Sequence, residues 1–149
     1  MKNEVERTAE ELAELTFKLL ANCLEKEERL AESHGLTQAE FRCLRMFNAN
    51  EIINNKTISE RMKLSPSRLT RIIDGLVEKG YIFRNVEPND RRNMRVYLSV
   101  QGVDIVNQLN AAYIDVHKQI LDNINIEEHA SLINAMKTLL VSLEKWITS

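Results

Sequence analysis

Apolar residues recur three or four positions apart through the first thirty residues, which is the spacing of one face of an α-helix. The stretch from Glu4 to Ser33 contains neither glycine nor proline, so nothing in it interrupts this pattern. We therefore predict one long helix over residues 4–33, ended at His34-Gly35 because glycine commonly follows the last turn of a helix. The predicted stripe consists of Leu12, Leu15, Leu19 and Cys23, widened by Leu20 and Leu24.

Two shorter helices are predicted next. Thr37 to Glu40 has the pattern of a capping box, in which the first and fourth side chains bond to each other's backbone N–H groups. Asn54 is a suitable N-cap for a short helix that ends at Met62. The apolar side chains expected to be buried in these two helices are Phe41, Leu44, Phe47, Ile58 and Met62.

The sharpest boundary in the sequence comes at Ser65-Pro66. Serine is a strong N-cap residue, and proline is favoured at the first helical position. A fourth helix is therefore predicted from here to Lys79-Gly80. Its expected buried face consists of Leu69, Ile72, Ile73, Leu76 and Val77, which lie at helical spacing.

The residues that follow predict a β-hairpin. The segments 81–86 and 94–98 are rich in β-branched and aromatic residues, and the turn-forming cluster Glu87-Pro-Asn-Asp90 lies between them. Beyond the hairpin, Ser99 is expected to cap a long helix towards Asn123, and Asn125 to Glu128 has the pattern of another capping box for a last helix. The apolar seam of the long helix is Val106, Leu109, Tyr113, Val116 and Ile120.

Charge is distributed unevenly along the chain. The net charge of all 149 residues is −2. Residues 56–95 carry 10 Lys+Arg against 5 Asp+Glu, whereas residues 1–55 and 96–149 are acidic, at net −4 and −3. A basic centre between acidic flanks indicates a polyanion-binding surface, and a solvated basic face without a partner is the alternative.

The exposed side of the predicted fourth helix has the chemistry of a DNA-recognition helix. Short serine and threonine side chains let a helix approach the groove floor, arginine reaches guanine edges or phosphates, and a helix N-terminus attracts phosphate. Together with the short helix before it, this segment is typical of a helix-turn-helix. A capped surface helix with exposed arginines is the alternative. The candidate DNA-binding residues are Ser65, Ser67, Arg68, Thr70 and Arg71.

The hairpin adds three further candidates, Arg91, Arg92 and Arg95, at its tip and on its returning strand. A hairpin beside a recognition helix can insert arginine into the narrow, strongly negative minor groove. We expect Asp90 to pair with one of these arginines and orient it rather than to touch DNA. The predicted fold class is mainly α, of the α+β winged helix-turn-helix type.

These segments carry a family resemblance. The run from Leu36 to Gly102 resembles a winged-helix regulator of the multiple-antibiotic-resistance repressor (MarR) family. The matching motifs are Gly35-Leu36-Thr37, SPSRLTRIIDGLVEKGYI, PNDRR and VYLSVQG, in the order and spacing of the family. Together they cover about half of the chain.

The resemblance implies a homodimer that binds a pseudo-palindromic operator in double-stranded DNA, usually as a repressor released by a small molecule or by oxidation. It implies one domain over residues 1–149. Residues 36–99 would form the winged helix-turn-helix part, and residues 1–35 and 100–149 a helical dimerisation part. In the family, the last arginine of the wing's Asp-x-Arg motif enters the minor groove, and here that residue is Arg92. Arg91 and Arg95 would contact the DNA backbone or remain solvated.

The signal that controls such a regulator is harder to predict. Family ligand pockets lie where the dimer helices meet the winged part, so the resemblance makes a phenolic or other aromatic effector conceivable. The candidate ligand-binding residues are Phe17, Phe41, Arg45 and Tyr113, each of which could equally belong to the core or the surface. Cys23 is the candidate for redox sensing, since some relatives sense peroxide through an N-terminal cysteine. No metal is predicted, because the three histidines are scattered.

Composition and motifs argue against two other classes of protein, membrane proteins and enzymes. The chain lacks an apolar run of eighteen residues and a signal-peptide pattern, so we expect a cytoplasmic protein without a membrane partner. We find no glycine-rich phosphate loop or catalytic grouping, which argues against an enzyme, and no cofactor is expected. A redox-sensing regulator, or a winged helix used only for protein contacts, remains the alternative to an effector-controlled repressor.

Overall fold

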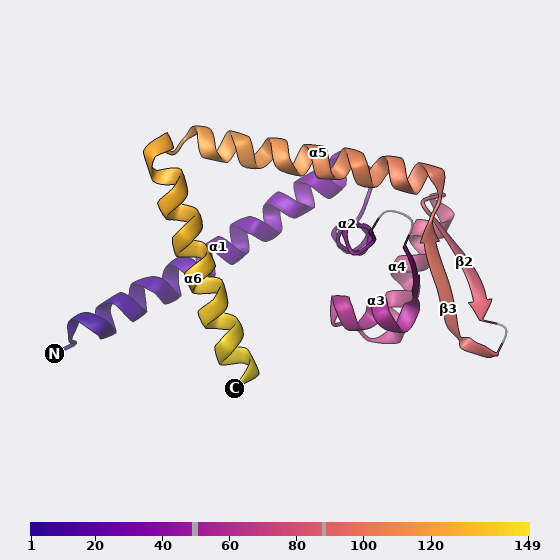
Figure 1. Cartoon of the computed structure of the whole chain (residues 1–149), viewed down its shortest axis with the longest axis horizontal. Helices are drawn as coiled ribbons and strands as arrows, with labels where there is room; N and C mark the ends of the chain where they lie inside the picture. Colours follow the sequence, from indigo (N-terminus) through magenta and orange to yellow (C-terminus); the bar gives the residue numbers. More distant parts are fainter. Residues whose placement is uncertain (49–50, 88) are drawn as a thin grey trace. The chain divides into compact units, whose positions relative to one another are not determined.

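The computed structural model describes residues 1–48, 51–87 and 89–149, and it describes only the backbone of residues 86, 87 and 90–93. The fold is mainly α, as predicted, and divides into two compact units, Met1–Leu109 and Asn110–Ser149. The described elements are α1 (Glu4–Ser33), α2 (Gln38–Arg45), β1 (Ile52–Asn54), α3 (Asn55–Met62), α4 (Pro66–Glu78), β2 (Ile82–Glu87), β3 (Asp90–Leu98), α5 (Val100–Asp122) and α6 (Ile126–Thr148) (Figure 1).

Helix α1 has the predicted bounds. Asn3 caps it, because its side-chain oxygen accepts a hydrogen bond from the Glu6 backbone N–H at 2.8 Å. The Glu6 carboxylate in turn accepts a hydrogen bond from the Asn3 backbone N–H. The helix ends before Gly35, whose φ of +69° suits glycine and strains other residues. Only Leu30 and Ala31 of α1 are buried, so most of its apolar stripe is exposed.

Helices α2, α3 and α4 begin where their caps predict. Thr37 and Glu40 form the predicted capping box, and Asn54 accepts a bond from the Thr57 N–H at 2.7 Å. Ile58 is buried as expected. Met62 is only half-buried because it lines a cavity, and Ile72 and Val77 of α4 are likewise half-buried at the edge of its apolar face. The remaining predicted core positions of these helices are fully buried: Phe41, Leu44, Phe47, Leu69, Ile73 and Leu76.

A polar cluster around the buried Glu40 joins the C-terminal end of α4 to the start of α2. Glu40 is 5% exposed, and its carboxylate accepts a hydrogen bond from Lys79 Nζ at 2.5 Å. Lys79 Nζ also donates to the Gly35 carbonyl at 3.0 Å. A buried carboxylate needs such partners, because the cost of removing it from water is recovered only by charge-assisted hydrogen bonds. The cluster therefore sets where α4 ends relative to α2.

The three strands form an antiparallel sheet in the order β1-β3-β2. The predicted hairpin is present, but β3 begins at Asp90, four residues earlier than the β-branched and aromatic residues indicated. Strand β1 was not predicted, because three residues are too few to show an alternating pattern. It forms because Ile53 pairs with Val96 of β3, and both side chains are buried. In Figure 1 the β2–β3 hairpin extends beyond α3 and α4.

The last two helices match their predicted ranges closely. Ser99 caps α5 by accepting a bond from the Gly102 N–H at 2.9 Å. The capping box predicted for α6 is wrong, because the Asn125 side chain makes no cap hydrogen bond. The Glu128 N–H donates instead to the Asn125 backbone carbonyl at 2.9 Å. Within the described residues, no helix combines the length and apolar character needed to cross a membrane.

Candidate nucleic-acid interface

The turn from α3 to α4 fixes the start of the candidate recognition helix. Lys63 ends α3 in the left-handed conformation, with φ 55° and ψ 45°. The Leu64 N–H then donates to the Ser59 carbonyl at 3.1 Å, and Ser59 Oγ donates to the Leu64 carbonyl at 2.5 Å. Ser65 caps α4 by accepting from the Arg68 N–H at 3.4 Å, and Pro66 occupies the first turn as predicted. These contacts join α3 to α4 through a tight turn, as a helix-turn-helix requires.

All five predicted DNA-binding residues of α4 lie on its exposed side. Ser65 and Ser67 hydroxyls are 3.3 Å apart, and Thr70 Oγ1 donates to the Pro66 carbonyl at 2.9 Å. Among the described residues, neither Arg68 nor Arg71 has an acidic side chain within ion-pairing distance. The helix therefore presents two unpaired guanidinium groups and short hydroxyl side chains, and this combination can donate hydrogen bonds to phosphates and base edges. The exposed set is Ser65, Ser67, Arg68, Thr70 and Arg71.

The opposite side of α4 holds this surface in place. Leu69, Ile73 and Leu76 are at most 2% exposed, so the helix cannot rotate without exposing them. An ion pair between Asp74 of α4 and Arg84 of β2 also joins the helix to the hairpin. Sequence reasoning missed this pair, because no spacing rule connects a helix to the following strand. The one sequence signal was an acidic residue on an otherwise basic face.

The hairpin places Arg95 on β3, where it pairs with Asn54 of β1 and Asn85 of β2. Arg95 is exposed, so its side chain lies at the surface of the sheet. The Met94 N–H donates to Asn55 Oδ1 at 3.3 Å, which extends the contact between β3 and the start of α3. The side chains of Asp90, Arg91 and Arg92 lie outside the described residues, and their predicted roles stay predictions.

The four candidate ligand-binding residues belong to different helices, namely α1, α2 and α5. Phe41 is fully buried, and the Arg45 guanidinium carbon lies 5.8 Å from the centre of its ring. Phe17 is 76% exposed on α1. Tyr113 belongs to the other unit, where its ring centre is 4.6 Å from that of His117. Within the first unit, the structure therefore brings Phe41 and Arg45 together.

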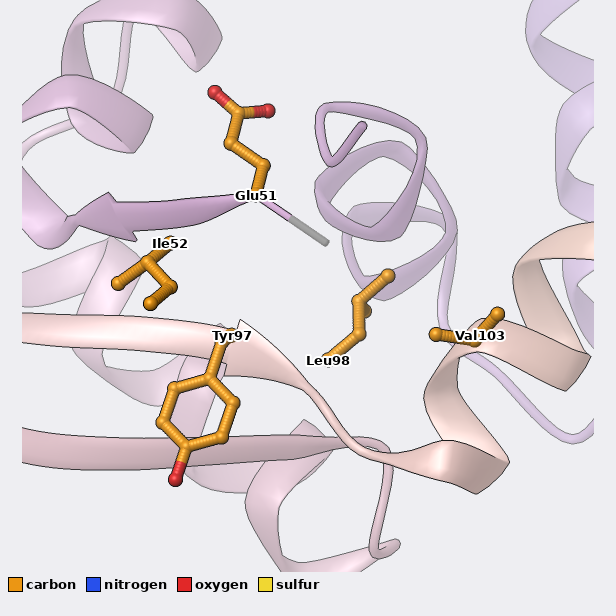
Figure 2. A pocket seen from close by; sticks show the side chains of 5 residues that line it. All are labelled: Glu51, Ile52, Tyr97, Leu98 and Val103. Atoms are coloured by element: carbon orange, nitrogen blue, oxygen red, sulfur yellow. The ribbon is translucent and has the colours of Figure 1, made fainter. Parts of the chain in front are cut away.

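Two cavities of about 220 Å³ each lie within the first unit, and none of these four residues lines them. Figure 2 shows the first, with Glu51 and Ile52 at the start of β1, Leu98 on β3 and Val103 on α5. Hydrogen bonds from Arg61 and from the Asn48 N–H lower the pKa of Glu51, so this rim of the cavity is anionic. The second cavity is lined by Leu24, Gln38, Ala39, Arg42, Met62 and Leu64.

The two cysteines differ in their surroundings. Cys23 is exposed on α1, with Lys26 Nζ 3.9 Å from its sulfur. Cys43 is buried in α2, where burial and the negative charge of Glu40 raise the pKa of its thiol to about 12. Cys43 is therefore a protonated core residue at neutral pH. Within the described part of the chain, no three histidine, cysteine or acidic side chains are grouped so that they could hold a metal ion.

A tight turn between two helices, an exposed polar start to the second, and a β-hairpin packed beside it together define a winged helix-turn-helix protein. The MarR family model matches residues 36–94. The chain is also 30% identical over 108 residues, covering 71% of each chain, to the HTH-type transcriptional regulator SarZ of Staphylococcus haemolyticus. The chain therefore belongs to the MarR family of transcriptional regulators, which are DNA-binding proteins rather than enzymes.

Solved structures agree with this assignment. A cysteine-to-serine mutant of MarR from Escherichia coli superposes with a TM-score of 0.75 at 25% identity, covering 87% of this chain and 96% of that one. The same mutant in complex with operator DNA gives a TM-score of 0.64 at 27% identity, covering 83% and 91%. The winged helix-turn-helix predicted from the sequence is thus confirmed.

Proposed function

We propose that the protein is a homodimeric transcriptional repressor that binds a pseudo-palindromic operator. The observation that carries the proposal is the exposed start of α4, where Arg68 and Arg71 lie unpaired among short hydroxyl side chains in the described structure. The similarity to a MarR protein solved with operator DNA supports the same use of this surface. The start of α4 then lies in the major groove, where its side chains read base edges and phosphates.

The wing supplies the second contact in this proposal. Arg92 enters the adjacent minor groove, Asp90 orients it, and Arg91 and Arg95 contact phosphates. A hairpin of this kind exploits the strongly negative potential of a narrow minor groove. The basic charge of residues 56–95 supports this arrangement, because the whole excess of positive charge in the chain lies there.

The dimer in the proposal forms through α1, α5 and α6. Each of these helices exposes large apolar side chains, and contiguous apolar surface marks protein interfaces. A two-fold dimer presents its two recognition helices about 34 Å apart, one turn of DNA. The exposed side chains include Leu12, Leu15, Leu19, Leu20, Ile114, Ile120, Met136, Leu140, Leu143 and Trp146.

Release from DNA is proposed to follow binding of a small aromatic effector near Phe17, Phe41, Arg45 and Tyr113. One observation favours redox control as a second candidate, namely the exposure of Cys23 beside Lys26. Replacing Cys23 by serine distinguishes effector control from redox control. Under redox control the variant should no longer leave DNA on addition of peroxide, whereas effector control should be unchanged.

Selection of bound sequences from a random DNA library, at two salt concentrations, tests the proposed function. A dimer that neutralises eight to ten phosphates should give a log–log salt slope of about −7 to −9 and a palindrome with half-sites about ten base pairs apart. Shuffled versions of the recovered site serve as the control for non-specific binding. A winged helix that only binds proteins would enrich no sequence at either salt concentration, and that outcome would refute the proposal.

A further inference from the structure

We propose that Arg84 is a positioning residue for DNA binding, because it holds Asp74 and thereby keeps Arg71 available for DNA. The inference rests on the proposed function, since it assumes that the exposed face of α4 meets DNA. It assigns a role to two residues, Arg84 and Asp74, that lie outside the set predicted to touch DNA. The role is indirect, because Arg84 acts on DNA through Asp74 and Arg71.

The first step concerns where Asp74 lies on α4. Residues three and four apart are neighbours on a helix, so Asp74 lies beside both Thr70 and Arg71. Its side chain is 51% exposed, on the same side as the candidate DNA-binding residues. A free carboxylate at this place would repel phosphates, and it would also lie within reach of the Arg71 guanidinium.

The second step concerns how Arg84 reaches Asp74. Arg84 pairs with Val96 across the β2–β3 ladder, and Val96 pairs with Ile53 of β1. Directly paired residues project from the same face of a sheet, and Val96 and Ile53 are buried. Arg84 therefore leaves β2 on the core-facing side, where its side chain remains 37% exposed and forms the ion pair with Asp74. The position of Arg84 on β2 thus places its guanidinium group beside α4.

The third step is the competition for Asp74. Arg71 has no acidic partner among the described residues, because the adjacent carboxylate is already paired with Arg84. When Arg84 is removed, the cation nearest to Asp74 along α4 is Arg71, at a spacing that allows a helical ion pair. Such a pair would withdraw Arg71 from DNA and leave the face of α4 less positive. An arginine that contacts DNA is typically worth a factor of about ten in affinity.

A set of variants at these three positions tests the mechanism by fluorescence anisotropy on one operator fragment. We expect Arg84→Ala to weaken DNA binding about tenfold, the typical value of one arginine contact. The double variant Asp74→Asn/Arg84→Ala should bind as Asp74→Asn alone does, because no carboxylate remains to capture Arg71. In the Arg71→Ala background, Arg84→Ala should weaken binding much less than tenfold, because only the repulsion of phosphates by the freed Asp74 carboxylate remains. A purely structural role for Arg84 would produce neither of these two results.

Two results would overturn the inference. If Arg84→Ala weakens binding equally in the wild-type and Asp74→Asn backgrounds, Arg84 touches DNA itself or supports the wing. If Arg84→Ala leaves affinity unchanged, the ion pair is an idle surface contact. Arg29→Ala is the matched control, because it removes one arginine from an exposed ion pair with Glu25 on α1 and should change affinity little. Wild-type protein that fails to bind DNA would refute the proposed function itself.

Discussion

The winged part of the protein and its long helices differ in how many of their apolar side chains they bury. Every fully buried apolar side chain in the described residues lies between Leu30 and Leu109. Helix α4, with 13 residues, buries three of them, whereas α6, with 23 residues, buries none. A helix without buried residues gains too little from its own chain to be stable, since helical stability comes mainly from packing. The described core therefore holds the winged part together with the adjoining ends of α1 and α5, whereas α6 would find its burial in the proposed dimer.

The largest expected effect is on the helices that lack an internal core. Leu140 is 55% exposed on α6, and in the proposed dimer two copies are buried. Replacing it by glutamate should weaken the dimer by about 4 kcal/mol for the two copies, or roughly a thousandfold in Kd. Sedimentation measures this directly. Asn134→Glu adds the same charge elsewhere on α6 and should leave the dimer intact. A dimer unaffected by Leu140→Glu would place the interface on another surface.

The next prediction concerns the core of the winged part. Ile73 is fully buried on α4, so Ile73→Ala should lower the free energy of unfolding by about 3 kcal/mol, through lost burial and a residual cavity. Urea unfolding at a fixed protein concentration measures the loss. Ile52→Ala is the matched control, because Ile52 is 63% exposed, and its cost should stay below about 1 kcal/mol. Equal losses from the two variants would contradict the separation into core and surface.

The buried Cys43 and the exposed Cys23 should affect the pH dependence of stability differently. Cys43 keeps its proton when folded because its pKa is about 12, against an ordinary value of 9.0. A pKa raised by folding stabilises the protein below the unfolded pKa, and this contribution is lost as pH rises from 9 towards 12. The free energy of unfolding should therefore fall with an added slope approaching about 1.4 kcal/mol per pH unit. The slope should disappear in Cys43→Ala and persist in Cys23→Ala, and a slope that survives in Cys43→Ala would assign it to other groups.

The smallest expected effects come from two helix caps. Thr37 makes both bonds of its capping box in the winged part, so Thr37→Ala should cost about 1 kcal/mol of stability. Asn125 makes no side-chain cap bond to α6, and Asn125→Ala should cost only a few tenths. Thermal unfolding of the two variants compares them directly. A larger loss from Asn125→Ala would show that its side chain caps α6 in solution.

Local signals were sufficient for most helix boundaries, because a cap and its helix are neighbours in sequence. The bounds of α1 and the Ser65-Pro66 start of α4 followed from such signals and are confirmed. Strand β1 could not be found, because its three residues form a strand only against β3. Asparagine is a suitable residue type for a cap, but the Glu128 N–H donates to the backbone carbonyl of Asn125 and not to its side chain.

At the candidate DNA interface, too, only the features set by nearby residues could be predicted from the sequence. The exposed residues of α4 could be predicted, since helical periodicity separates them from Leu69, Ile73 and Leu76. The Asp74–Arg84 ion pair could not, because it depends on how the hairpin packs against the helix. Predictions for the ligand site were weaker still, since Phe41 turned out to be a fully buried core residue next to Arg45.

The confinement of the core to residues before Asn110 also sets an order of events on the ribosome. All the apolar side chains that are fully buried in the described residues have been synthesised once Leu109 is added, and the 40 residues Asn110–Ser149 follow. At about 5–20 residues per second, that interval lasts roughly 2–8 s. Domains fold as units during synthesis, from the N-terminal side first. The residues of the described core are therefore synthesised seconds before those of α6, and pairing of two chains in the proposed dimer is a later step that also needs α6.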